Sequence, residues 1–248
     1  VTPTSLAGIE NIVATATANV TLGLANAAAV TSVTASGSTG ALTVTGIAAG
    51  ADLAVQSTGQ AATFSYASTA GAQSANLSVA GVTGAATITV DGVETIAVTG
   101  TGASTYQLDA DSASGLTFAG AGSQTITLAS MTAVSNFNAS AATGAVDLTL
   151  INQSGLLAAT DLSVSGGAGS DTLTVSAHTQ SDISVNGGDG NDTITHTAIA
   201  VGETVDGGDG TDILSTTSAR ANALDAATPT TYTITNVETL SVSDQLAA

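Results

Sequence analysis

Apolar residues alternate with threonine or serine in short runs along the whole chain. Such alternation is typical of a β-strand with one buried face. About 22 runs occur, one every 11 residues or so, and Gly, Ser, Asn and Asp separate them. This regularity predicts an all-β protein, as a solenoid, a sandwich or a barrel. Clear examples of the runs are 41–45, 86–90, 124–128, 145–150, 171–175 and 232–235.

One stretch predicts a short helix, residues 218–227, with Ser218 as its N-cap and Pro229 just beyond its end. Aromatic residues make up only 2% of the chain, whereas Ala, Val and Thr are abundant. Small and β-branched residues predict a thin core between strands.

Three nonapeptides in the last third fit the pattern Gly-Gly-x-Gly-x-Asp-x-apolar-x, at 166–174, 187–195 and 207–215. Glycine allows the backbone to turn through φ > 0 and to aim carbonyl oxygens inward, and the Asp adds a carboxylate. Ca²⁺ takes six to eight oxygens, which two stacked loops can supply. The predicted calcium-binding residues are Gly166, Gly167, Ala168, Gly169, Asp171, Gly187, Gly188, Asp189, Gly190, Asp192, Gly207, Gly208, Asp209, Gly210 and Asp212.

The nonapeptides begin 21 and then 20 residues apart. One coil of about 20 residues would place all three loops on the same side of a roll. We therefore predict one row of ions with two sites, one between 166–171 and 187–192 and one between 187–192 and 207–212. The alternative is three tight turns with solvated Asp side chains. A degenerate copy at 119–127 has Gln124 in place of Asp, and it should make the turn without binding an ion.

The nonapeptides closely resemble the RTX repeats of secreted bacterial proteins, whose loops bind Ca²⁺ in a parallel β-roll. A repeat, an Ala-rich spacer and a strand with Val-Glu-Thr-Leu at 237–240 are similar to modules of the Caulobacter-type RTX surface-layer proteins. The resemblance is specific over 160–243 and compositional over 1–159. It implies type I secretion, calcium-dependent assembly into a sheet on the bacterial cell surface, and attachment to surface polysaccharide.

We therefore expect a parallel β-solenoid, of the β-roll or β-helix type, in two regions. Residues 160–248 would form the RTX β-roll with its terminal strands. Residues 1–159 would form a solenoid or a sandwich without calcium motifs. Because Val1 is not preceded by Met, the chain is interpreted as a processed product or a segment of something larger.

Charge changes the picture of function. The chain has 19 acidic residues and one basic residue, Arg220, for a net charge of -18. Such a polyanion repels nucleic acid and anionic membranes but attracts cations. Facing carboxylates on coils about 4.8 Å apart repel by roughly 3 kcal/mol at an effective dielectric constant of about 20. Calcium is therefore expected to fold residues 160–215.

The absence of Cys excludes disulfides and thiol chemistry, and no apolar run is long enough to insert into a membrane.

The leading functional hypothesis is an extracellular structural protein that assembles with copies of itself into a surface layer or filament. Asp189 and Asp209 would either bridge neighbours or be solvated. The alternative is a spacer or display module of an RTX adhesin; an ice-binding version is disfavoured because the Thr-x-Thr intervals are irregular. No enzyme is expected, since Arg220 is the only permanent cation and His178 and His196 are interpreted as surface histidines.

A weaker recurrence places Glu10, Glu94 and Glu238 between apolar residues in similar short segments. We interpret each as a solvated Glu on an edge strand of comparable modules. A lattice contact or an additional cation ligand is the alternative.

Overall fold

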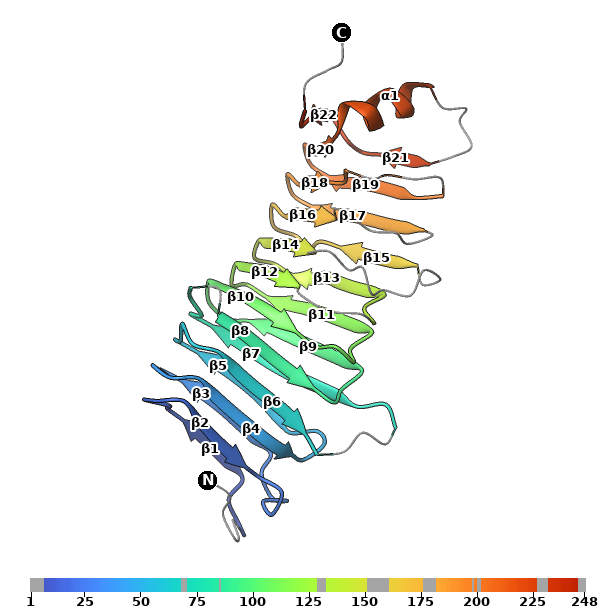
Figure 1. The fold of residues 1–248 in the computed structure, drawn as a ribbon. Helices are drawn as coiled ribbons and strands as arrows, with labels where there is room; N and C mark the ends of the chain where they lie inside the picture. Colours follow the sequence, from blue (N-terminus) through green and yellow to red (C-terminus); the bar gives the residue numbers. More distant parts are fainter. Residues whose placement is uncertain are drawn as a thin grey trace.

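The chain forms a long stack of β-coils in the computed structural model, and two parallel sheets make up its walls (Figure 1). The structure describes residues 7–67, 71–84, 86–128, 133–150, 161–175, 182–197, 199, 202–226 and 232–244. Each coil adds one strand to each sheet, so both sheets have eleven strands. The predicted parallel β-solenoid is confirmed.

Sheet A contains the odd-numbered strands: β1 (Asn11–Ala14), β3 (Ser32–Ser36), β5 (Asp52–Gln56), β7 (Ser74–Ala80), β9 (Thr95–Gly100), β11 (Gly115–Gly120), β13 (Asn136–Ala142), β15 (Leu162–Ser165), β17 (Ile183–Asp189), β19 (Thr204–Asp209) and β21 (Thr233–Thr235). Sheet B contains the even-numbered strands: β2 (Val20–Gly23), β4 (Leu42–Ile47), β6 (Ala62–Tyr66), β8 (Ala86–Asp91), β10 (Ser104–Asp109), β12 (Gln124–Leu128), β14 (Val146–Leu150), β16 (Thr172–Val175), β18 (Thr193–Thr195), β20 (Ile213–Thr216) and β22 (Thr239–Val242).

The core is a narrow layer between the two sheets. Alternate residues of each strand point inward, and the parallel register stacks them into columns, as for Leu148, Leu173 and Ile194. Two of the few aromatic side chains, Phe118 and Phe137, lie in this layer in the middle of the stack, and their rings stack at a centroid distance of 4.5 Å. The strand sequences therefore alternate because one face is buried and the other is solvated.

The sheets run continuously from the first part of the chain into the last. β13 pairs with β15 and β14 pairs with β16, so the coils on either side of residue 160 hydrogen-bond directly. The described strands before residue 150 therefore belong to the same two sheets as the strands after residue 161.

The one helix of the described chain, α1 (Ser218–Ala226), lies in the connection from β20 to β21, as predicted. Its N-cap is Thr217 rather than Ser218, because Thr217 Oγ1 accepts the N–H of Arg220 at 3.4 Å. Asp244 adds a second acceptor, for the N–H of Ser218. No helix in the described part of the chain is long and apolar enough to cross a membrane.

The outer face of sheet B carries a row of threonine residues. The Thr-x-Thr pairs are irregularly spaced in sequence, yet the register aligns Thr127, Thr149, Thr174 and Thr195 in one row. Connections of different length absorb the irregular intervals while the strands stay in register. Asp147 and Ile213 interrupt the row beside it, so the face is not a uniform array of hydroxyl groups.

Candidate calcium-binding column

The three glycine-rich loops lie on the same side of the solenoid, one above the other. Each loop connects a strand of sheet A to the next strand of sheet B: β15 to β16, β17 to β18, and β19 to β20. The pairing of Gly188 with Gly208 and of Asp189 with Asp209 stacks the upper two loops residue by residue. The prediction of a single row of loops on the same side is confirmed, and all fifteen predicted residues belong to it.

The glycines are required because consecutive coils touch through their backbones. A Cβ on Gly188 would overlap the carbonyl oxygen of Gly167, and a Cβ on Gly208 would overlap that of Gly188. Gly188 and Gly208 also have φ angles of 108° and 98°, which disfavour any residue with a side chain. Loop carbonyl oxygens therefore point along the stack: those of Gly167 and Gly188 towards the next coil, and those of Gly187 and Gly207 towards the preceding one.

Asp171, Asp192 and Asp212 form a buried column, which we call the Asp column. Each residue comes just before a strand of sheet B and is at most 2% exposed. Oδ1 of Asp192 accepts the N–H of Asp171 at 2.8 Å, and Oδ1 of Asp212 accepts the N–H of Asp192 at 2.8 Å. The carboxylates therefore link consecutive coils by charge-assisted hydrogen bonds.

The second carboxylate oxygens have a different environment. Oδ2 of Asp171 accepts the N–H of Gly167 at 2.6 Å, but Oδ2 of Asp192 and Oδ2 of Asp212 are buried and have no hydrogen-bond partner in the described structure. A Cβ on Gly187 would overlap both Oδ2 of Asp192 and the carbonyl oxygen of Gly207. Two acceptor oxygens thus point into the same space, and a positive charge there would satisfy both.

Electrostatics supports the same conclusion. Burial, together with the nearby carboxylates of Asp171, Asp212 and Asp189, raises the pKa of Asp192 from 3.8 to about 6, and the hydrogen bond from the N–H of Asp171 opposes this rise. Burial also raises the pKa of Asp171, although hydrogen bonds from Gly167 and Val146 oppose this. The column is therefore an unfavourable place for negative charge unless a cation compensates it.

The degenerate copy provides an internal comparison. Gln124 follows a loop in which Gly120 has a φ of 103°, close to those of Gly188 and Gly208. Its buried amide Nε2 donates to the carbonyl oxygens of Gly102 at 2.8 Å, Ser123 at 3.0 Å and Gly122 at 3.2 Å. At this coil an amide donates to the loop carbonyls, whereas the carboxylates of Asp192 and Asp212 can only accept. Oε1 of Gln124 is also buried without a hydrogen-bond partner in the described structure, so the difference between the coils lies in the donor and the charge.

The described residues contain no group of three or more His, Asp or Glu side chains arranged to hold a metal ion. Any ion in the column would therefore depend on backbone carbonyls together with one carboxylate from each loop. Such an all-oxygen set suits a hard cation such as Ca²⁺. Asp189 and Asp209 are exposed and lie in register at the rim of the column.

The interpretation of His196 as a surface residue is wrong. Its side chain is 1% exposed, and Nε2 lies 3.2 Å from Oε2 of Glu203, which is also buried. The alternation that buries Asp192 and Ile194 continues to His196, so the same signal could have placed this residue inside. His178 lies outside the described residues.

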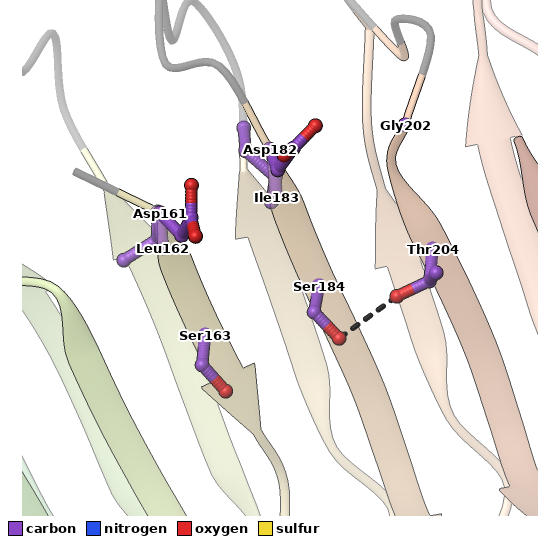
Figure 2. A pocket seen from close by; sticks show the side chains of 8 residues that line it. All are labelled: Asp161, Leu162, Ser163, Asp182, Ile183, Ser184, Gly202 and Thr204. Atoms are coloured by element: carbon purple, nitrogen blue, oxygen red, sulfur yellow. Dashed lines mark hydrogen bonds between the residues drawn. The ribbon is translucent and has the colours of Figure 1, made fainter. Parts of the chain in front are cut away.

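A second acidic corner lies at the opposite ends of the same sheet A strands. Asp161 and Asp182 occupy corresponding positions just before β15 and β17, beside a shallow hollow (Figure 2). Thr204 Oγ1 donates to Ser184 Oγ at 2.8 Å across this hollow. Both carboxylates are exposed to solvent, so this corner lacks the buried acceptor oxygens of the Asp column.

The three recurrent Glu residues do not occupy equivalent places. Glu10 and Glu94 precede β1 and β9 in sheet A, whereas Glu238 precedes β22 in sheet B. In the register between coils, Glu238 lies next to Asp212 and continues the line of the Asp column. The interpretation of comparable modules therefore does not extend to Glu238.

No protein-family model matches this chain, and a search of curated proteins finds no match.

Proposed function

We propose that this chain is a calcium-stabilised structural segment of an extracellular bacterial layer or filament, without enzymatic activity. The observation that carries the proposal is the buried Oδ2 of Asp192, which has no hydrogen-bond partner in the described structure and shares one space with the carbonyl oxygen of Gly207. A calcium ion between the loops 187–192 and 207–212 would satisfy both and neutralise the raised-pKa carboxylate. A second ion would lie between 166–171 and 187–192, where Oδ2 of Asp171 and the carbonyl of Gly187 also converge.

The remaining chemistry of the chain fits a structural role. Four of its six Phe and Tyr side chains are almost fully buried and cannot form a platform for a sugar or peptide: Phe64, Tyr106, Phe118 and Phe137. Arg220 is the only Lys or Arg of the sequence. A rigid acidic rod with a row of cation sites is suited to mechanical support outside the cell, where calcium is abundant.

Self-assembly is supported by the ends of the stack and by its rim. Within the described chain, β1 and β2 at one end and β21 and β22 at the other pair on one side only. Val13 is 72% exposed and Leu240 is 49% exposed at these ends. Unpaired edges can add strands from another copy, and the exposed pair Asp189 and Asp209 can share a calcium ion with a neighbour.

Electron microscopy of the purified chain, with millimolar calcium and with EGTA, tests the proposal. Sheets or filaments should form in calcium and disperse in EGTA. The double variant D189N/D209N should retain its calcium-dependent fold but assemble less, because these two carboxylates lie at the rim and not in the buried column. Monomers that persist at high concentration in calcium would contradict assembly and favour an adhesin spacer.

A further inference from the structure

The coil above the last glycine-rich loop continues the Asp column without a glycine motif. Glu238 comes just before β22, whose first residue pairs with the first residue of β20, so it follows Asp212 in register. Oε2 of Glu238 accepts the N–H of Asp212 at 2.7 Å. This is the same link that Asp212 makes to Asp192. Glu238 therefore performs in its coil the hydrogen bonding that Asp performs in the loops below.

Asn236 takes the place of a loop glycine. Its φ is 51°, in the left-handed region that Asn adopts more readily than other residues with a side chain. A Cβ on Gly207 would overlap the carbonyl oxygen of Asn236 and would lie 2.6 Å from Oδ2 of Asp212. The carbonyl of Asn236 thus faces Asp212 as the carbonyl of Gly207 faces Asp192.

The space between these groups contains a buried oxygen that needs a partner. Asp212 is 1% exposed, and its Oδ2 has no hydrogen bond in the described structure. An unpaired buried carboxylate oxygen is costly, and here the carbonyl oxygen of Asn236, another acceptor, faces the same space. Only a cation or a bound donor can satisfy both oxygens.

We propose that Oδ2 of Asp212, the carbonyl of Asn236 and the carboxylate of Glu238 hold an additional calcium ion, above the last glycine-rich loop. This inference rests on the proposed calcium-dependent function, since it lengthens the same row of ions by one. Asn236 and Glu238 are exposed, so water completes the oxygen shell from the outer side. The site is therefore more open than those between two glycine loops, and it binds calcium more weakly and exchanges it faster.

The site gives calcium control over the end of the solenoid. β21 and β22 are the last strands of their sheets, and their coil is joined to the coil below through Asp212 and Glu238. Calcium at this position secures the coil that the next copy would contact. Loss of this ion at intermediate calcium concentration would loosen the end while the lower coils stay folded.

Calorimetric calcium titration of the wild type and of Glu238→Gln tests the inference. Glutamine keeps an oxygen for the N–H of Asp212 but removes the charge. The variant should lose one equivalent of calcium, the weakest, and keep the tighter sites. The matched control is Glu94→Gln, because Glu94 accepts the N–H of Gln73 in a similar way at the opposite corner, away from the column. This control should bind as many ions as the wild type.

If the variant folds poorly, a crystal structure of the wild type grown in calcium tests the inference instead. Anomalous density should lie between Asp212 and Asn236. Density beside Asp192 alone, or an unchanged stoichiometry in Glu238→Gln, would overturn this inference and leave the proposed function standing. A wild type that binds no calcium would overturn both.

Discussion

Replacing Asp192 with Asn should change stability in opposite directions with and without calcium. Asn keeps Oδ1 as the acceptor for the N–H of Asp171, and its new amide group faces the carbonyl oxygen of Gly207. The amide can then donate to that carbonyl, as the amide of Gln124 donates to the carbonyls of Gly122 and Ser123 in its own loop and of Gly102 in the preceding coil. Without calcium, the variant is relieved of a buried negative charge.

The size of the effect follows from the pKa of Asp192. Burial and neighbouring carboxylates raise this pKa from 3.8 to about 6. At neutral pH the ionised side chain therefore costs about 3 kcal/mol, at about 1.36 kcal/mol for each pKa unit. Asp192→Asn should raise the free energy of unfolding by up to this amount in EGTA. When the calcium concentration is a hundred times the dissociation constant of the wild-type site, the bound ion stabilises the wild type by about 2.7 kcal/mol. The variant should lack this contribution.

Urea unfolding followed by circular dichroism, in EGTA and in calcium at pH 7, measures both differences. Asp182→Asn is the matched control, because Asp182 belongs to the same coil but is exposed at the opposite corner; it should shift stability by less than about 0.5 kcal/mol in either condition. If Asp192→Asn destabilises the protein equally with and without calcium, the carboxylate is an ordinary hydrogen-bond acceptor and the reasoning fails.

Three further predictions follow from the same geometry. In EGTA, the free energy of unfolding should be greatest below about pH 4 and should fall as the pH rises to about 6, because Asp192 keeps a proton in the folded state that it has released in the unfolded state. In calcium, the free energy of unfolding should instead rise with pH over this range, since protons compete with the ion. Urea titrations at several pH values measure both dependences. Gly208→Ala should lower the thermal midpoint in calorimetry, because its Cβ would overlap the carbonyl of Gly188 and its φ is positive, whereas Gly50→Ala, also at positive φ but with open space around the Cβ, should cost less. His196→Leu and Glu203→Leu should each cost on the order of 3 kcal/mol in urea unfolding, while the double variant should be close to the wild type; an additive double variant would contradict a paired core site.

The strand pattern was readable from the sequence because burial imposes a period of two on every coil. The same pattern, with the spacing of the glycine motifs, correctly placed the three loops in one row. The sequence singled out Glu238, with an additional cation ligand as the alternative role, but it did not show that this residue continues the Asp column. Asn236 and Glu238 reproduce the turn and the carboxylate with residues that no glycine motif specifies. The sequence also could not show which oxygen of each Asp is consumed by the backbone, since this depends on the register between coils.

His196 was misplaced for a different reason. It was interpreted as a surface residue, although the alternation from Asp192 through Ile194 continues to it and places its side chain inside. The buried partner, Glu203, comes from the following coil, so the pair depends on a contact between coils. Local periodicity therefore predicts which face a residue occupies, while partners across coils require the register.

Hydrogen–deuterium exchange tests the central claim most directly, because the protein contains its own control. Strands β15 to β20 flank the glycine-rich loops, whereas β3 to β10 belong to the same sheets but lie in coils without these loops. Calcium should slow amide exchange in β15 to β20 by at least tenfold, and it should leave exchange in β3 to β10 nearly unchanged. Equal exchange rates in EGTA and in calcium throughout β15 to β20 would contradict the account.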